Sequence, residues 1–401
     1  MMRKGLSFGS PPGVLFSSGV TWSEVRKTSV HALRDFGYGH HVFEGIIDEE
    51  TENLINYIEN NCLNKPVEDE NFFNVAVLAA LWRIISGESL KIGDPKLQLL
   101  TQAVANLTHA SGDSLIAMSF ESLPLYKLLN KIGYTDQQEN FDLLLDYTSS
   151  VVQKIKSSTI DSENYTNFTE EIISKIQHTD DPNHPFYGKT GELNLVNLLF
   201  DLFLAGADTS ATTFEWMMIY LIKNPEAQIN ARKELESTIG LSERANYDDR
   251  HLTPYNEAVI HEVHRMASIV PMSIFHYVTQ DMQVESFKVP SGTILIPMII
   301  EVMKSPKHFP NPEEFKPERY LVEESENVLK FVPNKHVVPF GIGNRKCLGE
   351  ILARMTLYKF MTAIIQKYDI VSGQSEPITD EALPGYIRNP IPYKFKFVPR
   401  M

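Results

Sequence analysis

The residues best suited to chemistry surround Cys347, in the run FGIGNRKCLG over residues 340–349. A cysteine binds a metal as its thiolate, and both cationic neighbours and the free N–H groups of a helix start lower the pKa of a thiol. Arg345 and Lys346 supply positive charge, and a helical pattern follows the cysteine at once. The run therefore predicts a loop that holds a thiolate of low pKa against a metal such as iron.

Four further residues of this run would shape the loop. Gly341 and Gly343 allow backbone angles that other residues resist. Gly349 has no side chain, so a flat cofactor could lie close to the helix that follows, and Phe340 could shield the sulfur from water. These features favour a thiolate placed beneath a flat cofactor.

Other roles for Cys347 stay open on the residues alone. Most free cysteines are small buried hydrophobic residues. Structural zinc and iron–sulfur clusters usually take several cysteine or histidine ligands, whereas this chain has 2 cysteines, Cys62 and Cys347. A disulfide between them is compatible with the sequence, although Cys62 lies in a polar stretch without a matching signature. A haem axial ligand needs a single thiolate, which pushes electron density onto the iron and favours O–O cleavage.

A second candidate site lies within a long apolar helical pattern, at the run LAGADTS over residues 204–210. A glycine such as Gly206 costs about 1 kcal/mol relative to alanine in a helix, but it would let a flat ring system approach. Thr209 can bond back to the carbonyl of Ala205 and open the helix locally. The resulting groove could hold dioxygen and water, to which Asp208 and Thr209 would deliver protons. The alternative is a buried helix that uses small and hydroxylated residues for packing or for a kink.

The rest of the chain must position these two segments, and its pattern is mostly helical. Apolar residues recur at helical spacing over residues 22–34, 42–58, 72–85, 141–156, 193–223, 255–268 and 348–367. Strand patterns occupy residues 274–278, 283–287, 294–297, 369–371 and 393–398, with a turn at Ser291-Gly292. Residues 305–339 are too rich in proline for either period. The prediction is one mostly α unit with a small β component.

Composition limits the class of protein. The formal net charge of -14 argues against a nucleic-acid binder, whose surface would be basic. No run of 18 or more apolar residues indicates a transmembrane helix, and the first residues lack the apolar segment of a signal peptide. The small number of cysteines fits a reducing compartment or the cytosolic side of a membrane.

The run FGIGNRKCLG resembles the haem-thiolate loop of the cytochromes P-450, and every position of that pattern is filled. Further matches extend from about Phe16 to the C-terminus. The run LRDFGYG over residues 33–39 and the pair Gly349-Glu350 resemble the animal microsomal members that metabolise drugs and steroids. The resemblance implies the cytochrome P-450 fold and a single haem-thiolate monooxygenase domain over residues 1–401. The family's membrane anchor, first helices and first strands have no counterpart here, so we expect an N-terminally incomplete member that takes up haem weakly on its own.

The resemblance also implies roles for particular residues. Cys347 would be the axial ligand of haem b (iron protoporphyrin IX), and Asp208 and Thr209 would be catalytic in oxygen activation. Residues that would contact the haem are Trp22, Arg26, Ala205, Gly206, His276, Phe340, Arg345 and Gly349, of which Trp22, Arg26, His276 and Arg345 would face the propionates.

One more cluster would be structural. Glu262 and Arg265 lie three residues apart on a helix, so that their side chains can meet. The family adds an arginine from the proline-rich stretch, which is Arg319 here, and the network would fix the segment that leads to the cysteine. His261 and His264 resemble a metalloprotease helix, but that zinc motif separates its histidines by four residues rather than three.

The function implied is that of a haem-dependent monooxygenase. It would insert one oxygen atom from O2 into a lipophilic substrate, such as a xenobiotic, steroid or fatty-acid-like molecule, bound partly by residues 269–272 and 385–387. Electrons would come from NADPH through the flavoprotein NADPH–cytochrome P-450 reductase, docked on basic residues near the cysteine (Lys335, His336, Arg345 and Lys346). The full-length form would lie on the membrane surface, at the cytosolic face of the endoplasmic reticulum.

Three alternatives belong to other classes of protein: a haem-binding remnant without turnover, a haem sensor, and a metallohydrolase. The Asp208-Thr209 pair favours an enzyme over a sensor, which would need no proton relay. The family segments without a counterpart here favour the remnant.

Overall fold

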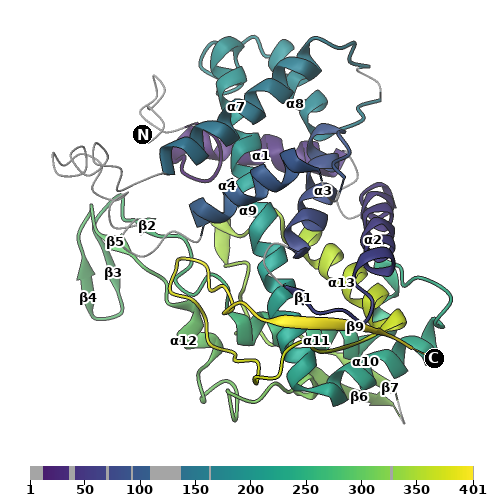
Figure 1. Ribbon diagram of the computed structural model, residues 1–401. Helices are drawn as coiled ribbons and strands as arrows, with labels where there is room; N and C mark the ends of the chain where they lie inside the picture. Colours follow the sequence, from purple (N-terminus) through teal and green to yellow (C-terminus); the bar gives the residue numbers. More distant parts are fainter. Residues whose placement is uncertain are drawn as a thin grey trace.

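The computed structural model describes residues 12–35, 41–68, 72–91, 94–108, 137–161, 164–325 and 328–400. Most of this chain is helical, with small sheets gathered toward one side and the base of the molecule (Figure 1). The longer helices are α1 (Gly19–Asp35), α2 (His41–Asn61), α3 (Phe72–Ser86), α4 (Pro95–Thr108), α7 (Gln137–Lys156), α8 (Phe168–Gln177), α9 (Gly188–Lys223), α10 (Pro225–Thr238), α11 (Pro254–Ala267) and α13 (Glu350–Lys367). The predicted mostly α fold with a small β component is confirmed.

Helix α9 runs through the middle of the molecule (Figure 1) and packs against α3, α4, α7, α8 and α11. Nearly continuous apolar sequence makes it a helix that is buried on most sides. It ends at Asn224, whose backbone N–H donates to the Tyr220 carbonyl at 3.0 Å, because Pro225 cannot continue the pattern and instead begins α10. The segment LAGADTS thus lies in a helix that packs against several others.

Among the described residues, four small antiparallel sheets accompany the helices. The largest has the order β1-β9-β8, from β1 (Val67–Glu68), β9 (Lys394–Pro399) and β8 (Tyr368–Ser372). The others pair β2 (His276–Tyr277) with β5 (Ile294–Leu295), β3 (Met282–Val284) with β4 (Phe287–Val289), and β6 (Leu321–Ser325) with β7 (Val328–Phe331). The turn expected at Ser291-Gly292 is confirmed, with φ 90° at Gly292 and a hydrogen bond of 3.2 Å from the Thr293 N–H to the Pro290 carbonyl.

Some predicted boundaries differ from the structure. Residues 283–287 do not form one strand but the middle of a hairpin, which turns at Glu285 with φ 49°. The short helix α12 (Ile299–Met303) precedes the proline-rich stretch, and the β6–β7 hairpin lies within that stretch. Helices α4, α8 and α10 were not predicted, because their apolar faces are short and their stability comes from packing on neighbouring helices.

No helix among the described residues is long and apolar enough to cross a membrane. Most of the LRDFGYG run used in the family resemblance, residues 36–39, lies outside the described residues.

Candidate active site

The loop that carries Cys347 is closed by its own backbone. Gly341 and Gly343 have φ of 71° and 74°, in the left-handed region that other residues resist, as predicted. The Cys347 N–H donates to the Phe340 carbonyl at 2.9 Å, and the Lys346 N–H donates to the Gly343 carbonyl at 3.1 Å. The chain therefore folds back on itself before α13 begins, and the sulfur is presented at the end of this loop.

The thiol of Cys347 does not have the low pKa that the sequence predicted. Its side chain is solvent-exposed on one side, yet the protein packed around the rest of it raises the pKa of the thiol, and the negative charge of Glu350 adds to this. The backbone N–H of Gly349 and the charges of Arg26 and Lys346 lower the pKa but do not outweigh burial. Without a metal, the loop thus favours the thiol, and a cation that binds the sulfur must displace its proton.

Two salt bridges explain why the basic residues beside Cys347 lower the pKa of its thiol so little. Lys346 Nζ lies 2.5 Å from a carboxylate oxygen of Glu350, one helical turn later, and Arg354 Nη2 lies 3.1 Å from the other oxygen. The charge of Lys346 is therefore largely balanced beside the sulfur. Arg345 points elsewhere, toward α1.

Arg345, Arg26 and Trp22 meet, although 319 residues or more separate the arginine of the loop from the two residues of α1. The guanidinium of Arg345 lies over the Trp22 ring at 4.0 Å and donates to the Ser17 carbonyl at 2.9 Å. Arg26 donates to the Lys346 carbonyl at 2.6 Å. Burial, and then repulsion from Arg26, lower the pKa of Arg345. Two guanidinium groups thus converge beside the cysteine loop.

This donor set fits the group that the resemblance implies. A haem carries two propionates and takes one axial ligand. The cysteine loop supplies the free sulfur of Cys347 and the guanidinium of Arg345, and the guanidinium of Arg26 lies close enough to repel that of Arg345. Each guanidinium has five N–H donors and uses one in the hydrogen bonds recorded for it among the described residues. Donors therefore remain for a dianionic partner.

His276, the fourth predicted propionate ligand, lies on a different element from this group. It is exposed on β2, opposite Leu295 of β5. Within the part of the chain that the structure describes, no recorded interaction joins it to Trp22, Arg26 or Arg345. Its role stays a prediction.

On α9, the backbone bond predicted for Thr209 is present. Its hydroxyl donates to the Ala205 carbonyl at 2.7 Å, and the hydroxyl of Thr213 donates to the Thr209 carbonyl at 2.8 Å. Such bonds loosen and bend a helix. Ala205 is exposed and Thr209 is half-buried, so this side of α9 is open.

Gly206 and Asp208 face the opposite direction, toward α3. A Cβ on Gly206 would lie 2.5 Å from Cδ2 of Leu81, so the end of that leucine side chain would have to move to admit a larger residue. Asp208 is 1% exposed, and the side-chain amide of Asn74 donates to its Oδ1 at 3.1 Å. The structure therefore separates Asp208 from Thr209 around the helix, and Asn74 is a neighbour that no sequence signal indicated.

Phe340 packs between two other elements. Its ring meets the ring of His264 on α11 edge-on, with 5.2 Å between centroids, and the guanidinium of Arg354 on α13 lies 4.9 Å from its centre. Gly349 directly precedes α13, where a Cβ would come no closer than 4.0 Å to the Cys347 sulfur. Phe340 thus fixes the start of the loop, and Gly349 leaves room at its end.

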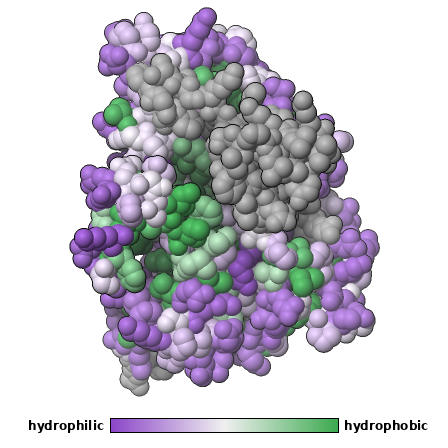
Figure 2. All heavy atoms as spheres, turned by 90° about the vertical axis from the view of Figure 1, so that its left-hand side faces the viewer, coloured by the Kyte–Doolittle hydropathy of each residue, from purple (hydrophilic) through white to green (hydrophobic). Residues whose placement is uncertain are grey.

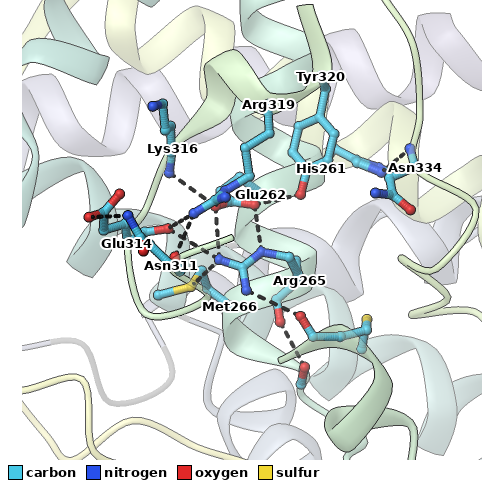
Figure 3. A network of polar contacts seen from close by, with 12 residues as sticks. His261, Glu262, Arg265, Met266, Asn311, Glu314, Lys316, Arg319, Tyr320 and Asn334 are labelled. Carbon is cyan, nitrogen blue, oxygen red and sulfur yellow. Dashed lines mark hydrogen bonds and ion pairs between the residues drawn. The ribbon is translucent and has the colours of Figure 1, made fainter. Parts of the chain in front are cut away.

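The network around Glu262 is confirmed and is larger than predicted (Figure 3). Its two carboxylate oxygens accept from Arg265 at 2.7 and 2.9 Å, and one of them also accepts from Arg319 Nε at 3.1 Å. Tyr320 donates to Oε2 at 2.5 Å, and the backbone N–H of Lys316 donates to Oε1 at 3.0 Å. One buried carboxylate therefore binds α11 to the segment that leads toward the cysteine.

The neighbouring histidines serve packing rather than metal binding. His261 Nε2 accepts from the Asn334 N–H at 3.3 Å, and its ring meets that of Tyr320 edge-on at 4.6 Å. No group of three or more potential metal ligands occurs among the described residues. Cys62 and Cys347 are both free, so the disulfide that the sequence allowed is absent.

The loops expected to contact a substrate lie side by side. Tyr386 donates to the Ser273 carbonyl at 2.6 Å, and the Arg388 N–H donates to the Ile269 carbonyl at 2.8 Å. Figure 2 shows the face on which β2–β5 lie, where hydrophobic side chains gather around a hollow. An apolar surface of this kind suits a lipophilic ligand.

One more contact was missed by sequence reasoning. Asp201 of α9 accepts from the backbone N–H groups of Val14 and Leu15 at 2.7 and 3.0 Å, and Asn194 accepts from the Gly13 N–H at 3.2 Å. This fixes the segment just before α1 against α9. No sequence motif could reveal it, because the donors are backbone groups.

Comparisons with known proteins agree with this geometry. The sequence profile of the family described as "Cytochrome P450" matches residues 4–397. Cytochrome P450 2A6 of Homo sapiens is 30% identical over 393 residues, which are 97% of this chain and 77% of that protein. Cytochrome P450 2A5 of Mus musculus is 32% identical over 394 residues, 97% of this chain and 77% of that protein. Cytochrome P450 2L1 of Panulirus argus is 28% identical over 399 residues, 98% of this chain and 79% of that protein.

Proposed function

The chain belongs to the cytochrome P450 family, and from this premise we propose that it is a haem-thiolate monooxygenase acting on a lipophilic substrate. The observation that carries the proposal is the loop of Cys347, where an exposed free sulfur lies close to the convergent guanidinium groups of Arg26 and Arg345. Cys347 would be the axial ligand, and the two arginines, with Trp22 beneath Arg345, would hold the propionates. When bound, the haem supplies the redox chemistry that activates dioxygen.

The protein's own part in the reaction would lie on α9. The hydroxyl of Thr209 sits on the open side of α9 and bonds the Ala205 carbonyl, and there it can orient water and pass a proton. Asp208 would supply protons from the buried side. Ala205 is exposed beside Thr209, so its small side chain would leave room for substrate or dioxygen.

The partners follow from the surface near the loop. Electrons from NADPH would arrive through the flavoprotein reductase. Lys307 and Lys335 bring positive charge close to His336, whose ring stacks on that of His308 at 3.7 Å, and the two lysines would extend the basic face predicted for that partner. The substrate class stays as broad as xenobiotic, steroid or fatty-acid-like, and the proposed location is the membrane surface at the cytosolic face of the endoplasmic reticulum.

The reduced, carbon monoxide-bound spectrum of the haem-loaded protein tests the proposal. We expect the red-shifted Soret band of a thiolate ligand and its loss in Cys347→Ala. Thr209→Ala should keep the band and bind substrate, but release more hydrogen peroxide and less product for each NADPH consumed. A histidine-type spectrum, or a folded protein that takes up no haem, would overturn the proposal.

A further inference from the structure

Asn74 is a buried polar residue near the start of helix α3, where its neighbours are apolar. Helix α3 is buried along almost its whole length, and Asn74 is 4% exposed. Its amide donates to Asp208 Oδ1 at 3.1 Å, whereas its own Oδ1 accepts no hydrogen bond from the described residues. A buried amide that is only partly hydrogen-bonded costs free energy, so stability alone does not account for this residue.

Helix α3 also closes on α9 at the same place. Cδ2 of Leu81 occupies the space that a Cβ on Gly206 would need, at 2.5 Å. The hydroxyls of Thr209 and Thr213 bond to backbone carbonyls one turn earlier in the same segment, and such bonds destabilise a helix slightly. Contacts with α3 at positions 206 and 208 therefore support this segment of α9.

We propose that Asn74 is a positioning residue that sets the direction of the Asp208 carboxyl group relative to Thr209. Consecutive residues of an α-helix lie about 100° apart, so Asp208 and Thr209 address different sides of α9 and need a fixed relative orientation to share a proton path. The Asn74 amide fixes one carboxyl oxygen without adding a charge. This inference rests on the proposed function, because it assigns Asn74 a part in the same proton delivery.

The first test is a double-mutant cycle on the haem-loaded protein. Asn74→Leu should lower the product formed per NADPH by about tenfold, because a misdirected carboxyl delivers protons poorly. In an Asp208→Asn background, the same change at Asn74 should have little further effect, since its action passes through Asp208. Independent, multiplicative effects of the two changes would overturn the inference.

The second test uses pH, which a purely structural role would not bring into play. In Asn74→Asp, two buried carboxyl groups lie within hydrogen-bond distance and share a proton at low pH, so that the new acid donates as the amide did. Product per NADPH in this variant should recover as the pH is lowered, whereas Asn74→Leu should show no recovery. Equal pH profiles for the two variants would contradict the inference.

A third measurement does not depend on activity. In the haem-free chain, Asn74→Leu should lower the unfolding midpoint, because the Asp208 carboxyl loses the hydrogen bond from the Asn74 amide. The double variant Asn74→Leu/Asp208→Leu should recover part of that loss. Asn197→Ala is the matched control: Asn197 is 2% exposed on α9 and bonds the Leu193 carbonyl at 2.8 Å, so it should change the midpoint but not the product yield.

The outcomes distinguish a failure of the inference about Asn74 from a failure of the proposed function. If Thr209→Ala wastes electrons as hydrogen peroxide while Asn74→Leu does not, the inference fails and the proposed function stands. If the carbon monoxide-bound spectrum lacks the thiolate band, or Thr209→Ala leaves the product yield unchanged, the failure lies in the proposed function itself.

Discussion

Arginines gather at two places near the cysteine loop, and the two places differ in how their charge is balanced. Arg265 is 0% exposed, and both it and Arg319 bind the single carboxylate of Glu262. Burial alone would lower the pKa of Arg265, but the hydrogen bonds and charge of Glu262 raise it. Arg26 and Arg345 lie close enough to repel, and this repulsion helps lower the pKa of Arg345. The first group is complete without a ligand, and the second is suited to receive an anion.

This difference separates a structural network from a binding site without reference to any family. A buried ion pair stabilises the fold only when all its members remain, because each lost partner leaves an uncompensated charge. Convergent like charges at a surface cost stability and are relieved when an anion binds. Substitutions in the two groups should therefore have opposite effects on the haem-free chain.

The largest effect is expected from Glu262→Ala. It leaves the guanidinium groups of Arg265 and Arg319 without their shared carboxylate, and should cost about 3–5 kcal/mol of unfolding free energy, enough to prevent folding of a marginal chain. Denaturant unfolding, or the yield of folded protein, measures this. Glu324→Ala is the control, since its exposed partner Lys330 is 2.6 Å away at the surface and the unfolding midpoint should not move. Equal behaviour of the two variants would show that the network is not structural.

Cys347→Ala should abolish the thiolate-type spectrum and turnover, yet leave the haem-free chain folded, because the side chain is exposed and its removal leaves no cavity. The unfolding midpoint of the haem-free variant, measured beside its spectrum with haem, checks both parts. A marked loss of stability without haem would place Cys347 in the structural group.

Low pH should destabilise the folded protein through the buried histidine His261. Burial is the main cause that lowers the pKa of His261 to about 4. An unfolded histidine binds a proton below pH ~6.5, so the stability from the neutral folded form is complete above that pH and is lost as the pH falls toward 4, by up to about 3 kcal/mol. His261→Phe should be less stable at neutral pH, since the Asn334 N–H loses its acceptor, but should lose less stability between pH 6.5 and 4.5. Parallel curves for the two proteins would refute this.

Arg26→Leu and Arg345→Leu should each weaken haem binding about tenfold, the value of one charge-assisted hydrogen bond. The haem-free chain should be unchanged or slightly more stable, because either change removes the repulsion between the two groups. Haem titration and unfolding of the same samples measure the two effects. His276→Leu should weaken haem binding less, because an exposed imidazole carries less charge at neutral pH than a guanidinium. If the haem-free Arg26→Leu variant were less stable than the unsubstituted chain, Arg26 would have a structural role like that of Glu262.

The smallest effect concerns the thiol itself. Glu350 is one cause of the raised pKa of Cys347, so Glu350→Gln should lower that pKa and also free Lys346 to act on the sulfur. The rate of alkylation against pH in the haem-free chain measures it, in a Cys62→Ser background that removes the second thiol. Superimposable rate profiles would mean that the sulfur does not sense Glu350.

Short patterns in the sequence predicted several features of this structure. Glycines at 341 and 343 adopt positive φ, and Thr209 bonds the Ala205 carbonyl, because both features depend on residue type and on neighbours within one helical turn. The spacing of Glu262 and Arg265 fixed their pairing for the same reason. The short strands and α4, α8 and α10 were less predictable, because tertiary packing rather than local periodicity stabilises them.

Charges and orientations were decided by the tertiary structure. The sequence showed basic residues beside Cys347, but the pairing of Lys346 with Glu350 and the turn of Arg345 toward Trp22 reversed the expected shift in the pKa of the thiol. The pKa depends on what surrounds a group in space, which neighbours in sequence do not specify.

The sequence by itself determined the family, the loop that carries Cys347 and the helix that carries Asp208 and Thr209, because these depend on short runs of residues with fixed spacing. Only the tertiary structure placed Asn74 against Asp208, 134 positions away, and separated a saturated arginine network from an unbalanced pair of guanidinium groups. Hydrogen bonds and electrostatic interactions act over a few ångströms in space, and the packing of α3 on α9 and of α1 on the cysteine loop sets which groups come that close.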